Sequence, residues 1–357
     1  MSRLAPSVAI TGGGIVGLSL AWRLAQRGLR VSVLEKGAMG GEASWAGAGM
    51  LAPGGEVEGP SELAAQAVES RNLYGAYVRD LQHDSGLAID FQETGALDLA
   101  YSAPEWQALE ARAAAQAPLG IRSQVIDRAD VSACWPRIRT DGLEGARFYP
   151  DDALVNPREV VLALCACCKK LGVALVQNCA VEEILFTSEA AVIRTAQFEA
   201  AFDSVVIAAG AWSSSIRIGG AALPAAEPVK GHLIGYQQPG QTSRTIIRHG
   251  PSYLMQRATG LLIAGASVEH LGFDRTIDFG IAAGLAASAA FVLPHLKGIT
   301  PTEIWNGLRP ASDALHTGRW QLERLFLAYG HYRNGILLAP LTAQKLAAEI
   351  SASLQTR

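Results

Sequence analysis

An arginine near the C-terminus, Arg333, stands in the short segment GHYRNG, where a positive charge could act on a ligand. The flanking pattern predicts a strand over residues 325–328 and a helix that begins near Gly335. A charged side chain at such a junction is either a solvated surface group or a charge directed into a binding site. The elements that surround Arg333 must decide between these two roles.

The beginning of the chain contains a glycine pattern typical of dinucleotide binding. Gly12, Gly14 and Gly17 form G-x-G-x-x-G after a predicted strand over residues 8–11 and at the start of a predicted helix. The first glycine permits a tight turn, the second lets the backbone approach a pyrophosphate, and the third lets helix and strand pack closely. The helix N-terminus adds free N–H groups and the positive end of its dipole. These residues predict a βαβ unit that binds a dinucleotide.

The residues after this unit bear on which dinucleotide binds. Glu35 ends a second predicted strand, over residues 31–34, where a carboxylate can accept hydrogen bonds from both ribose hydroxyls. This carboxylate disfavours a ribose 2′-phosphate and hence NADP. Segment 37–51 is rich in Gly, Ala and Ser, and small residues allow the backbone to run beside a large flat cofactor. NAD enzymes of this class normally have a helix here, so the segment favours FAD, although these residues leave NAD or FAD open.

The middle of the chain predicts a further part of the same sheet. A helix over residues 158–171, with Pro157 at its start and Gly172 at its end, leads to a strand over residues 173–177. A buried strand over residues 205–207 then ends in a small-residue turn that contains Gly210 and Trp212. Such a turn lies at the carboxyl edge of a parallel sheet, where ligands bind. Trp212 is either part of that site or a core aromatic residue.

The chain has 357 residues, which is too long for one compact core and indicates two domains. Segments 81–147 and 227–300 carry short alternating apolar runs, which predict a mixed or antiparallel sheet with helices. We therefore expect a discontinuous nucleotide-binding domain over residues 1–80, 148–226 and 301–357. The substrate-binding domain is expected over residues 81–147 and 227–300.

The composition indicates a soluble globular enzyme, since 49% of the residues are hydrophobic and 18% are charged. A net charge of -3 argues against nucleic acid and anionic membrane surfaces as partners. We see no signal peptide and no apolar run of about 18 residues, so we predict no membrane span. The five cysteines show neither a disulfide framework nor zinc-ligand spacing, which predicts a reducing, cytoplasmic location and no metal site.

Several segments together resemble the D-amino-acid-oxidase-like flavoprotein superfamily, and within it the glycine oxidase branch tied to thiamin biosynthesis. They are ITGGGIVGLSLAWRLA, GEASWAGAGML, VIAAGAWSS, EPVKGH, WNGLRPASD and GHYRNGILLAP. The likeness keeps the motif order over nearly the whole chain, and GHYRNGILLAP after GLRP is its most specific part. The resemblance implies an α/β fold. It would combine a Rossmann-like FAD-binding domain of the glutathione-reductase type with an inserted mixed or antiparallel-sheet substrate domain.

The resemblance implies noncovalent FAD as the cofactor. Relatives that bind flavin covalently use a cysteine near the C-terminal motif, and no cysteine follows Cys179 in this chain. The residues of this chain that the resemblance and the glycine pattern assign to the cofactor are Gly12, Gly14, Ile15, Val16, Gly17, Glu35, Lys36, Ala43, Ser44, Ala48, Gly49, Met50, Val181, Gly210, Trp212, His331, Tyr332, Asn334, Gly335, Ile336 and Leu337.

The resemblance also assigns the substrate pocket. Arg309 and Arg333 match the family's substrate-binding arginines, and Tyr253 matches its pocket tyrosine. The planar fork of arginine can bind both oxygens of a carboxylate. The implied reaction is oxidative deamination of glycine or another small amino acid, with hydride transfer from Cα to flavin N5, imine hydrolysis and reduction of O2 to H2O2. No general base is required, and His331 is expected to fix its loop.

Other functions stay open at this point. An FAD-dependent D-amino-acid or secondary-amine dehydrogenase would pass electrons to a quinone or a protein. A noncatalytic assembly subunit would keep only the fold, and an NAD-dependent dehydrogenase is disfavoured by segment 37–51. The family's Pro-x-Ile-Gly turn after GLRP is absent here, so substrate size is open as well. The expected partners are a small amino acid and O2, and the resemblance implies a homo-oligomer.

Overall fold

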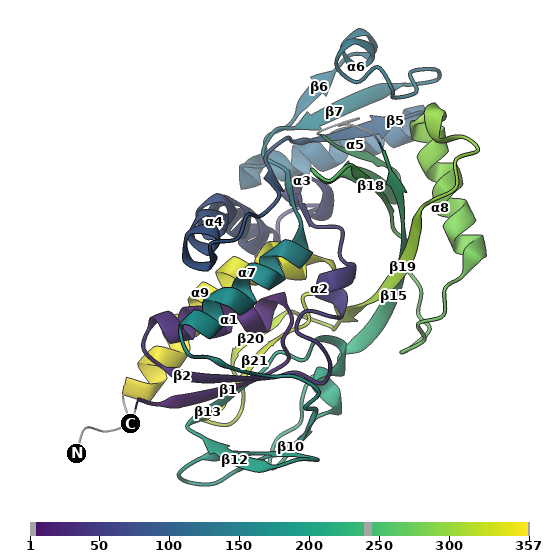
Figure 1. Cartoon of the computed structure of the whole chain (residues 1–357). Coiled ribbons are helices and arrows are strands. Elements are labelled where there is room, and N and C mark those ends of the chain that lie inside the picture. The colour runs from purple at the N-terminus through teal and green to yellow at the C-terminus, as the bar shows by residue number, and fades with distance from the viewer. Residues whose placement is uncertain (1–4, 239–244, 356–357) are drawn as a thin grey trace.

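The computed structural model describes residues 5–238 and 245–355, which form two parts lying end to end (Figure 1). One part is built on a six-stranded sheet and the other on an eight-stranded sheet. Two long paired strands, β15 (Glu227–Gln237) and β19 (Glu303–Ala311), run from the first part into the second. The fold class expected from the sequence, α/β with an inserted substrate part, is confirmed.

The six-stranded sheet has the order β20-β21-β13-β1-β2-β9, and only β20 is antiparallel to its neighbour. Its central strands are mainly apolar and largely buried because both faces of the sheet are covered, one by helices and the other by a smaller sheet. The strands are β1 (Ser7–Thr11), β2 (Arg30–Leu34), β9 (Ala174–Val176), β13 (Ser204–Ile207), β20 (His316–Arg319) and β21 (Leu325–Tyr329).

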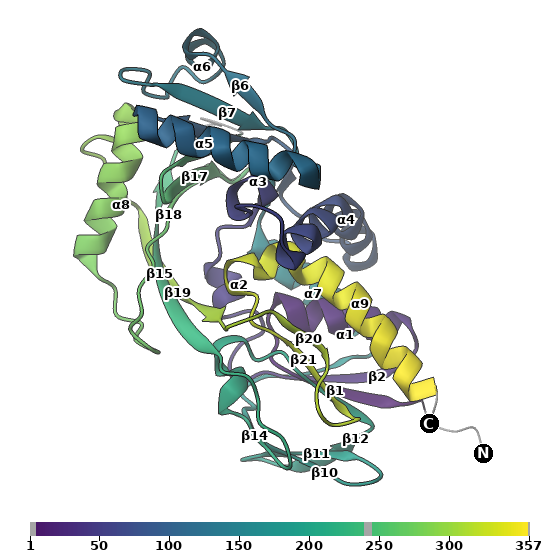
Figure 2. The ribbon, with the colours of Figure 1, turned by 180° about the vertical axis from the view of Figure 1, so that it is seen from behind.

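Four helices cover this sheet, and Figure 2 shows α9 lying along α1. Helix α1 packs against both α9 and α7, and α4 packs against α9 and α7. Leu18, Leu20 and Trp22 of α1 are fully buried, which makes α1 the centre of this layer. The helices are α1 (Ile15–Gln26), α4 (Glu62–Ser85), α7 (Pro157–Lys170) and α9 (Gly335–Gln355).

The eight-stranded sheet has the order β19-β15-β18-β17-β16-β5-β7-β6. Helix α8 (Phe279–Val292) packs on one of its faces through Ala282, Leu285 and Ala289, which join an apolar core with Ile234 and other strand residues. Two further helices are α5 (Ala103–Gln116) and α6 (Arg128–Cys134). The remaining strands are β5 (Ala96–Ala100), β6 (Gln124–Ile126), β7 (Gly145–Tyr149), β16 (Ile246–His249), β17 (Ser252–Gln256) and β18 (Leu261–Gly265).

Two smaller sheets complete the fold. The order in one is β12-β11-β10-β14 and in the other β3-β8-β4. Their strands are β10 (Val181–Phe186), β11 (Ala191–Thr195), β12 (Glu199–Phe202), β14 (Arg217–Ile218), β3 (Met50–Leu51), β8 (Ala153–Val155) and β4 (Phe91–Gln92). Segment 37–51, expected as a loop, holds the short helix α2 (Ala43–Ala46) as well as β3. The turn expected after β13 is the 3-10 helix η2 (Gly210–Ser215).

Two elements do not follow the expected division into domains. Helix α4 runs through the boundary at residue 80, and it packs on the helices of the six-stranded sheet. Strand β19 was expected in the nucleotide-binding domain, but it pairs along its whole length with β15 of the eight-stranded sheet. Such pairing between distant segments leaves no signal in the local sequence pattern. Residues 239–244 of the expected substrate domain lie outside the described residues, and the division into domains stays a prediction.

The described residues contain no group of His, Cys, Asp and Glu side chains that could hold a metal ion. All five cysteines are free, and three of them, Cys167, Cys168 and Cys179, are buried. Burial raises the pKa of the Cys165 thiol and that of its two neighbours on α7. Within residues 5–238 and 245–355, no helix is both long and apolar enough to cross a membrane.

Candidate active site

A large cavity lies where the two parts of the molecule meet. Its wall includes the β1–α1 turn, segment 42–50 and residues 208–212 from the first part. The second part adds β15, Tyr253 of β17 and residues 307–310 of β19. All the site residues expected from the sequence line this cavity except Gly17 and Leu337. The structure therefore brings the assigned cofactor and substrate residues together at one place.

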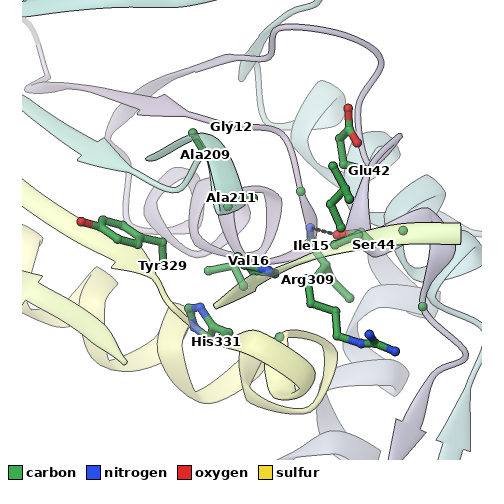
Figure 3. A pocket seen from close by; sticks show the side chains of 18 of the residues that line it. Gly12, Ile15, Val16, Glu42, Ser44, Ala209, Ala211, Arg309, Tyr329 and His331 are labelled. Carbon is green, nitrogen blue, oxygen red and sulfur yellow. Dashed lines mark hydrogen bonds between the residues drawn. The ribbon is translucent and has the colours of Figure 1, made fainter. Parts of the chain in front are cut away.

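The β1–α1 turn requires its glycines. Gly12 has a φ of +105°, and a Cβ there would lie 2.3 Å from the carbonyl oxygen of Ala208. A Cβ on Gly17 would lie 2.1 Å from the carbonyl oxygen of Gly12, so Gly17 serves helix–strand packing and does not line the cavity. The α1 N-cap, Gly14, has no side chain, and Ser44 Oγ accepts the Ile15 N–H at 2.9 Å (Figure 3). The helix N-terminus thus opens on the cavity.

Glu35 and Lys36 lie next to this turn. The buried Glu35 carboxylate accepts the N–H groups of Gly13 at 2.7 Å and Gly37 at 2.9 Å, so it also holds the loop backbone. The Lys36 ammonium lies 3.6 Å from the ring centroid of Trp212 and 2.7 Å from a Glu42 oxygen. Trp212 is only half-buried and lines the cavity, so it belongs to the site and not to the core.

These residues fit a dinucleotide such as FAD. A pyrophosphate needs N–H donors and a side-chain-free approach, and the α1 N-terminus with Gly12 and Gly14 supplies both. The wall beyond this turn consists mainly of small residues, which leaves room for a flat ring system. Two segments, 43–49 and 208–211, contribute most of these small residues: Ala43, Ser44, Ala46, Gly47, Ala48, Gly49, Ala208, Ala209, Gly210 and Ala211.

The segment between β21 and α9 closes another side of the cavity. His331 is buried, and its Nε2 lies 3.1 Å from Thr342 Oγ1 of α9. Burial lowers the pKa of His331 to about 4, so the ring is neutral at physiological pH. This arrangement agrees with the expected loop-fixing role. Leu337 lies one turn into α9, packs in the core and points away from the cavity, while its carbonyl accepts the Ser70 hydroxyl at 2.6 Å.

Arg309 and Tyr253, the residues expected to bind substrate, lie close together in the cavity wall. Arg309 Nη1 donates to the carbonyl oxygen of Ser267 at 3.0 Å and, at 3.4 Å, to that of Lys230. Burial is the main cause that lowers the pKa of the Arg309 guanidinium. Tyr253 is buried, and this burial raises the pKa of its hydroxyl to about 12 although Arg309 lies nearby. Tyr253 is thus a neutral hydrogen-bonding group at any working pH.

Arg333 lies on the same cavity, but its guanidinium already has a partner. Its Nε donates to Glu56 Oε2 at 3.0 Å and its Nη2 donates to Glu56 Oε1 at 3.2 Å. Burial lowers the pKa of Arg333, but the Glu56 carboxylate outweighs this and leaves it raised. Arg333 is directed into the site, where it forms an ion pair with an acidic residue of the protein.

Several cavity residues were not anticipated from the sequence. Glu56 lies in a segment without a recognisable motif, whereas Glu42 stands inside the GEASWAGAGML motif. Gly231, Gly307 and Pro310 stand inside or beside the EPVKGH and GLRP motifs, so those motifs were the signal that could have found them. The other cavity residues missed by sequence reasoning are Thr11, Leu34, Ala46, Gly47, Ala180, Ala208, Ala209, Ala211, Ser215, Ile216, Leu233, Leu308, Ala328 and Tyr329.

Comparisons with known proteins agree with this site. The family described as FAD dependent oxidoreductase, DAO, matches residues 7–349. A glycine oxidase from Geobacillus kaustophilus is 32% identical over 95% of this chain and 91% of its own length. A bifunctional protein ThiO/ThiG from Synechocystis is 31% identical over 94% of this chain, which spans 50% of that protein. The crystal structure of glycine oxidase from Geobacillus kaustophilus matches with a TM-score of 0.91 at 30% identity, over 98% of this chain and 95% of that one.

Proposed function

This chain belongs to the DAO family of FAD-dependent oxidoreductases, and on that premise we propose that it oxidatively deaminates glycine or another small amino acid. It is an FAD-dependent amine oxidoreductase, and the narrower assignment rests on the substrate end of the cavity. One observation carries it: among the described residues, the half-buried Arg309 has no carboxylate partner. A cation that is partly removed from water without an ion-pair partner is costly, and a substrate carboxylate would supply that partner.

The residues around Arg309 suit an amino acid. The Arg309 guanidinium would bind both carboxylate oxygens, and the neutral Tyr253 hydroxyl would add a hydrogen bond. FAD bound here would supply the redox chemistry, as the acceptor of a hydride from the substrate Cα, with O2 as the final oxidant and H2O2 as its product. The protein's task is then to hold Cα in line with the acceptor, and no side chain has to remove a proton from carbon. His331, neutral and bonded to Thr342, keeps the β21–α9 segment in place.

Three further properties belong to this proposal. FAD is held noncovalently in this proposal, which is supported by the lack of a cysteine, the residue that attaches flavin in covalent relatives, in the cavity lining of the described part of the chain. The protein works in the cytoplasm as a homo-oligomer, and its free cysteines are consistent with a reducing compartment. The imine released by the reaction would supply thiazole synthesis for thiamin, in line with the ThiO part of the Synechocystis relative.

An anaerobic titration of the purified yellow protein tests the proposal. Glycine, sarcosine, D-alanine, D-proline and L-alanine are added separately while the visible flavin band is followed. We expect fast bleaching by glycine and its loss in Arg309→Ala with FAD still bound. Absence of bleaching by all five amines would contradict the small-amino-acid assignment. Bleaching followed by reoxidation with a quinone but not with O2 would favour the dehydrogenase alternative.

A further inference from the structure

A buried polar cluster lies behind Arg309, on the far face of β15. Gly231 and Leu233 of β15 line the cavity, and successive side chains of a strand point to opposite faces. His232 therefore points away from the cavity, where it is fully buried. There it meets Ser267 and Glu269, which follow β18 in the chain. We name His232, Ser267 and Glu269 the back cluster.

Hydrogen bonds tie the back cluster together. Ser267 Oγ accepts the His232 backbone N–H at 2.7 Å and donates to Glu269 Oε1 at 2.5 Å. His232 Nδ1 lies 2.7 Å from the same Glu269 oxygen. His232 Nε2 accepts the backbone N–H of Asp278 at 3.0 Å, so the ring proton must be on Nδ1 and is donated to Glu269. His232 is fully buried, while Ser267 and Glu269 are partly buried, so these hydrogen bonds form in surroundings with little water, where they are stronger than in bulk water.

The back cluster is joined directly to Arg309. The carbonyl oxygen of Ser267 accepts a hydrogen bond from Arg309 Nη1 at 3.0 Å. The guanidinium lies over Gly231, where a Cβ would come within 2.2 Å of Nη1. Ser267 also donates its backbone N–H to the His232 carbonyl at 3.3 Å, so both its side chain and its backbone are anchored to β15.

Resting on the proposed function, we propose that His232, Ser267 and Glu269 are positioning residues for the substrate carboxylate. They fix the Ser267 carbonyl, and this carbonyl fixes the direction of the Arg309 guanidinium. Arginine has a long, flexible side chain, and a small displacement of a binding group costs much of its effect. None of the three residues lines the cavity. The back cluster therefore acts on substrate only through Arg309.

Acetate is the probe for this inference, because it offers a carboxylate without an amine. Its dissociation constant for the FAD-loaded protein is measured from the change in the flavin spectrum. We expect Ser267→Ala and Glu269→Ala each to weaken acetate binding about tenfold, since a charge-assisted contact loses its alignment. FAD affinity should not change. Glu269→Gln keeps an acceptor for His232 and Ser267, so it should restore most of the acetate affinity.

A double-mutant comparison separates positioning from general stability. In an Arg309→Met background, Ser267→Ala should cause no further loss of acetate affinity, because the guanidinium it acts on is gone. Asp274→Asn is the matched control, since Asp274 lies in the same segment and binds the buried Lys230 ammonium at 2.5 Å. It should lower the thermal midpoint without weakening acetate binding.

Three results would overturn the inference: unchanged acetate affinity in Ser267→Ala, an equal loss in the Arg309→Met background, or an equal loss in Asp274→Asn. A different result would show that the proposed function is wrong. If acetate binding depends on Arg309 and on the back cluster while glycine leaves the flavin oxidised, the substrate assignment is wrong and the inference stands.

Discussion

Arg333 and Glu56 face each other across the cavity wall in a two-point ion pair, with N–O distances of 3.0 and 3.2 Å. Arg333 belongs to η4 (Tyr332–Asn334) and Glu56 ends the short helix α3 (Pro53–Glu56). The side chain of Gln116 fixes the position of α3. Its Nε2 donates to the carbonyl oxygen of Gly54, within α3, and to that of Val57, the residue after α3. Glu56 thus neutralises Arg333, one of the two cavity arginines, and in the proposed function Arg309 is the one that would bind a substrate anion.

Removing the charge of Glu56 should change which substrates bind. In Glu56→Gln, Arg333 becomes available to a second carboxylate, so a dicarboxylic amine such as iminodiacetate should gain about tenfold in kcat/KM relative to glycine. Steady-state oxygen uptake with both amines measures this ratio. Glu58→Gln is the control, because Glu58 is exposed and has no ion pair with either arginine. An unchanged ratio in Glu56→Gln would show that the ion pair does not select substrate charge.

Gly231 is expected to determine where the Arg309 guanidinium lies, because the missing side chain leaves space for it. A Cβ at this position would lie 2.2–2.5 Å from three guanidinium atoms of Arg309, so Gly231→Ala must displace that flexible end. We expect KM for glycine to rise at least about tenfold with little change in FAD affinity. Gly284→Ala on the exposed face of α8 is the control, because no atom would lie within 4 Å of its Cβ. It should keep KM and raise the free energy of unfolding by about 0.5–1 kcal/mol.

The local sequence was enough to predict the nucleotide half of the site. The glycine pattern, Glu35 and the strand over residues 205–207 belong to short βα units whose geometry depends on nearby residues. The predicted bounds of β1, β2, α7 and the start of α9 agree with the structure to within about two residues. The resemblance supplied the substrate half, and it named residues that line the same cavity.

Other features depend on packing between distant segments and could not be predicted. Glu56 has no motif around it, and only the position of α3 brings it to Arg333. The helix that begins at Gly335 turns the Leu337 side chain into the core, while the expected approach of the Leu337 backbone to the cofactor stays a prediction. The role of Gly231 follows from the pairing of β15 with β19, which places Arg309 beside it. An isolated strand sequence does not specify its neighbours.

Gly12 should be essential for FAD binding. In Gly12→Ala the new Cβ would lie 2.3 Å from the backbone oxygen of Ala208, and backbone atoms cannot move aside as a side chain can. Flavin fluorescence titration of the apoprotein should show FAD affinity reduced at least about tenfold. Gly28→Ala is matched to it, since Gly28 also has a positive φ, +79°, but no atom lies within 4 Å of its Cβ. It should lower stability by about 1 kcal/mol and keep FAD affinity; equal FAD loss in both variants would contradict the steric explanation.

His331 should make the folded protein sensitive to mild acid. Burial holds the pKa of His331 at about 4, below the value of about 6.5 in an unfolded chain. Between these values the unfolded chain binds a proton that the folded protein does not, so the free energy of unfolding falls as the pH falls. From pH 7 to pH 5 this residue should remove about 2 kcal/mol. Urea unfolding of wild type and His331→Gln at both pH values measures the difference, with the exposed His83→Gln as control. If His331→Gln lost as much stability as the wild type over this range, His331 would not be the group responsible.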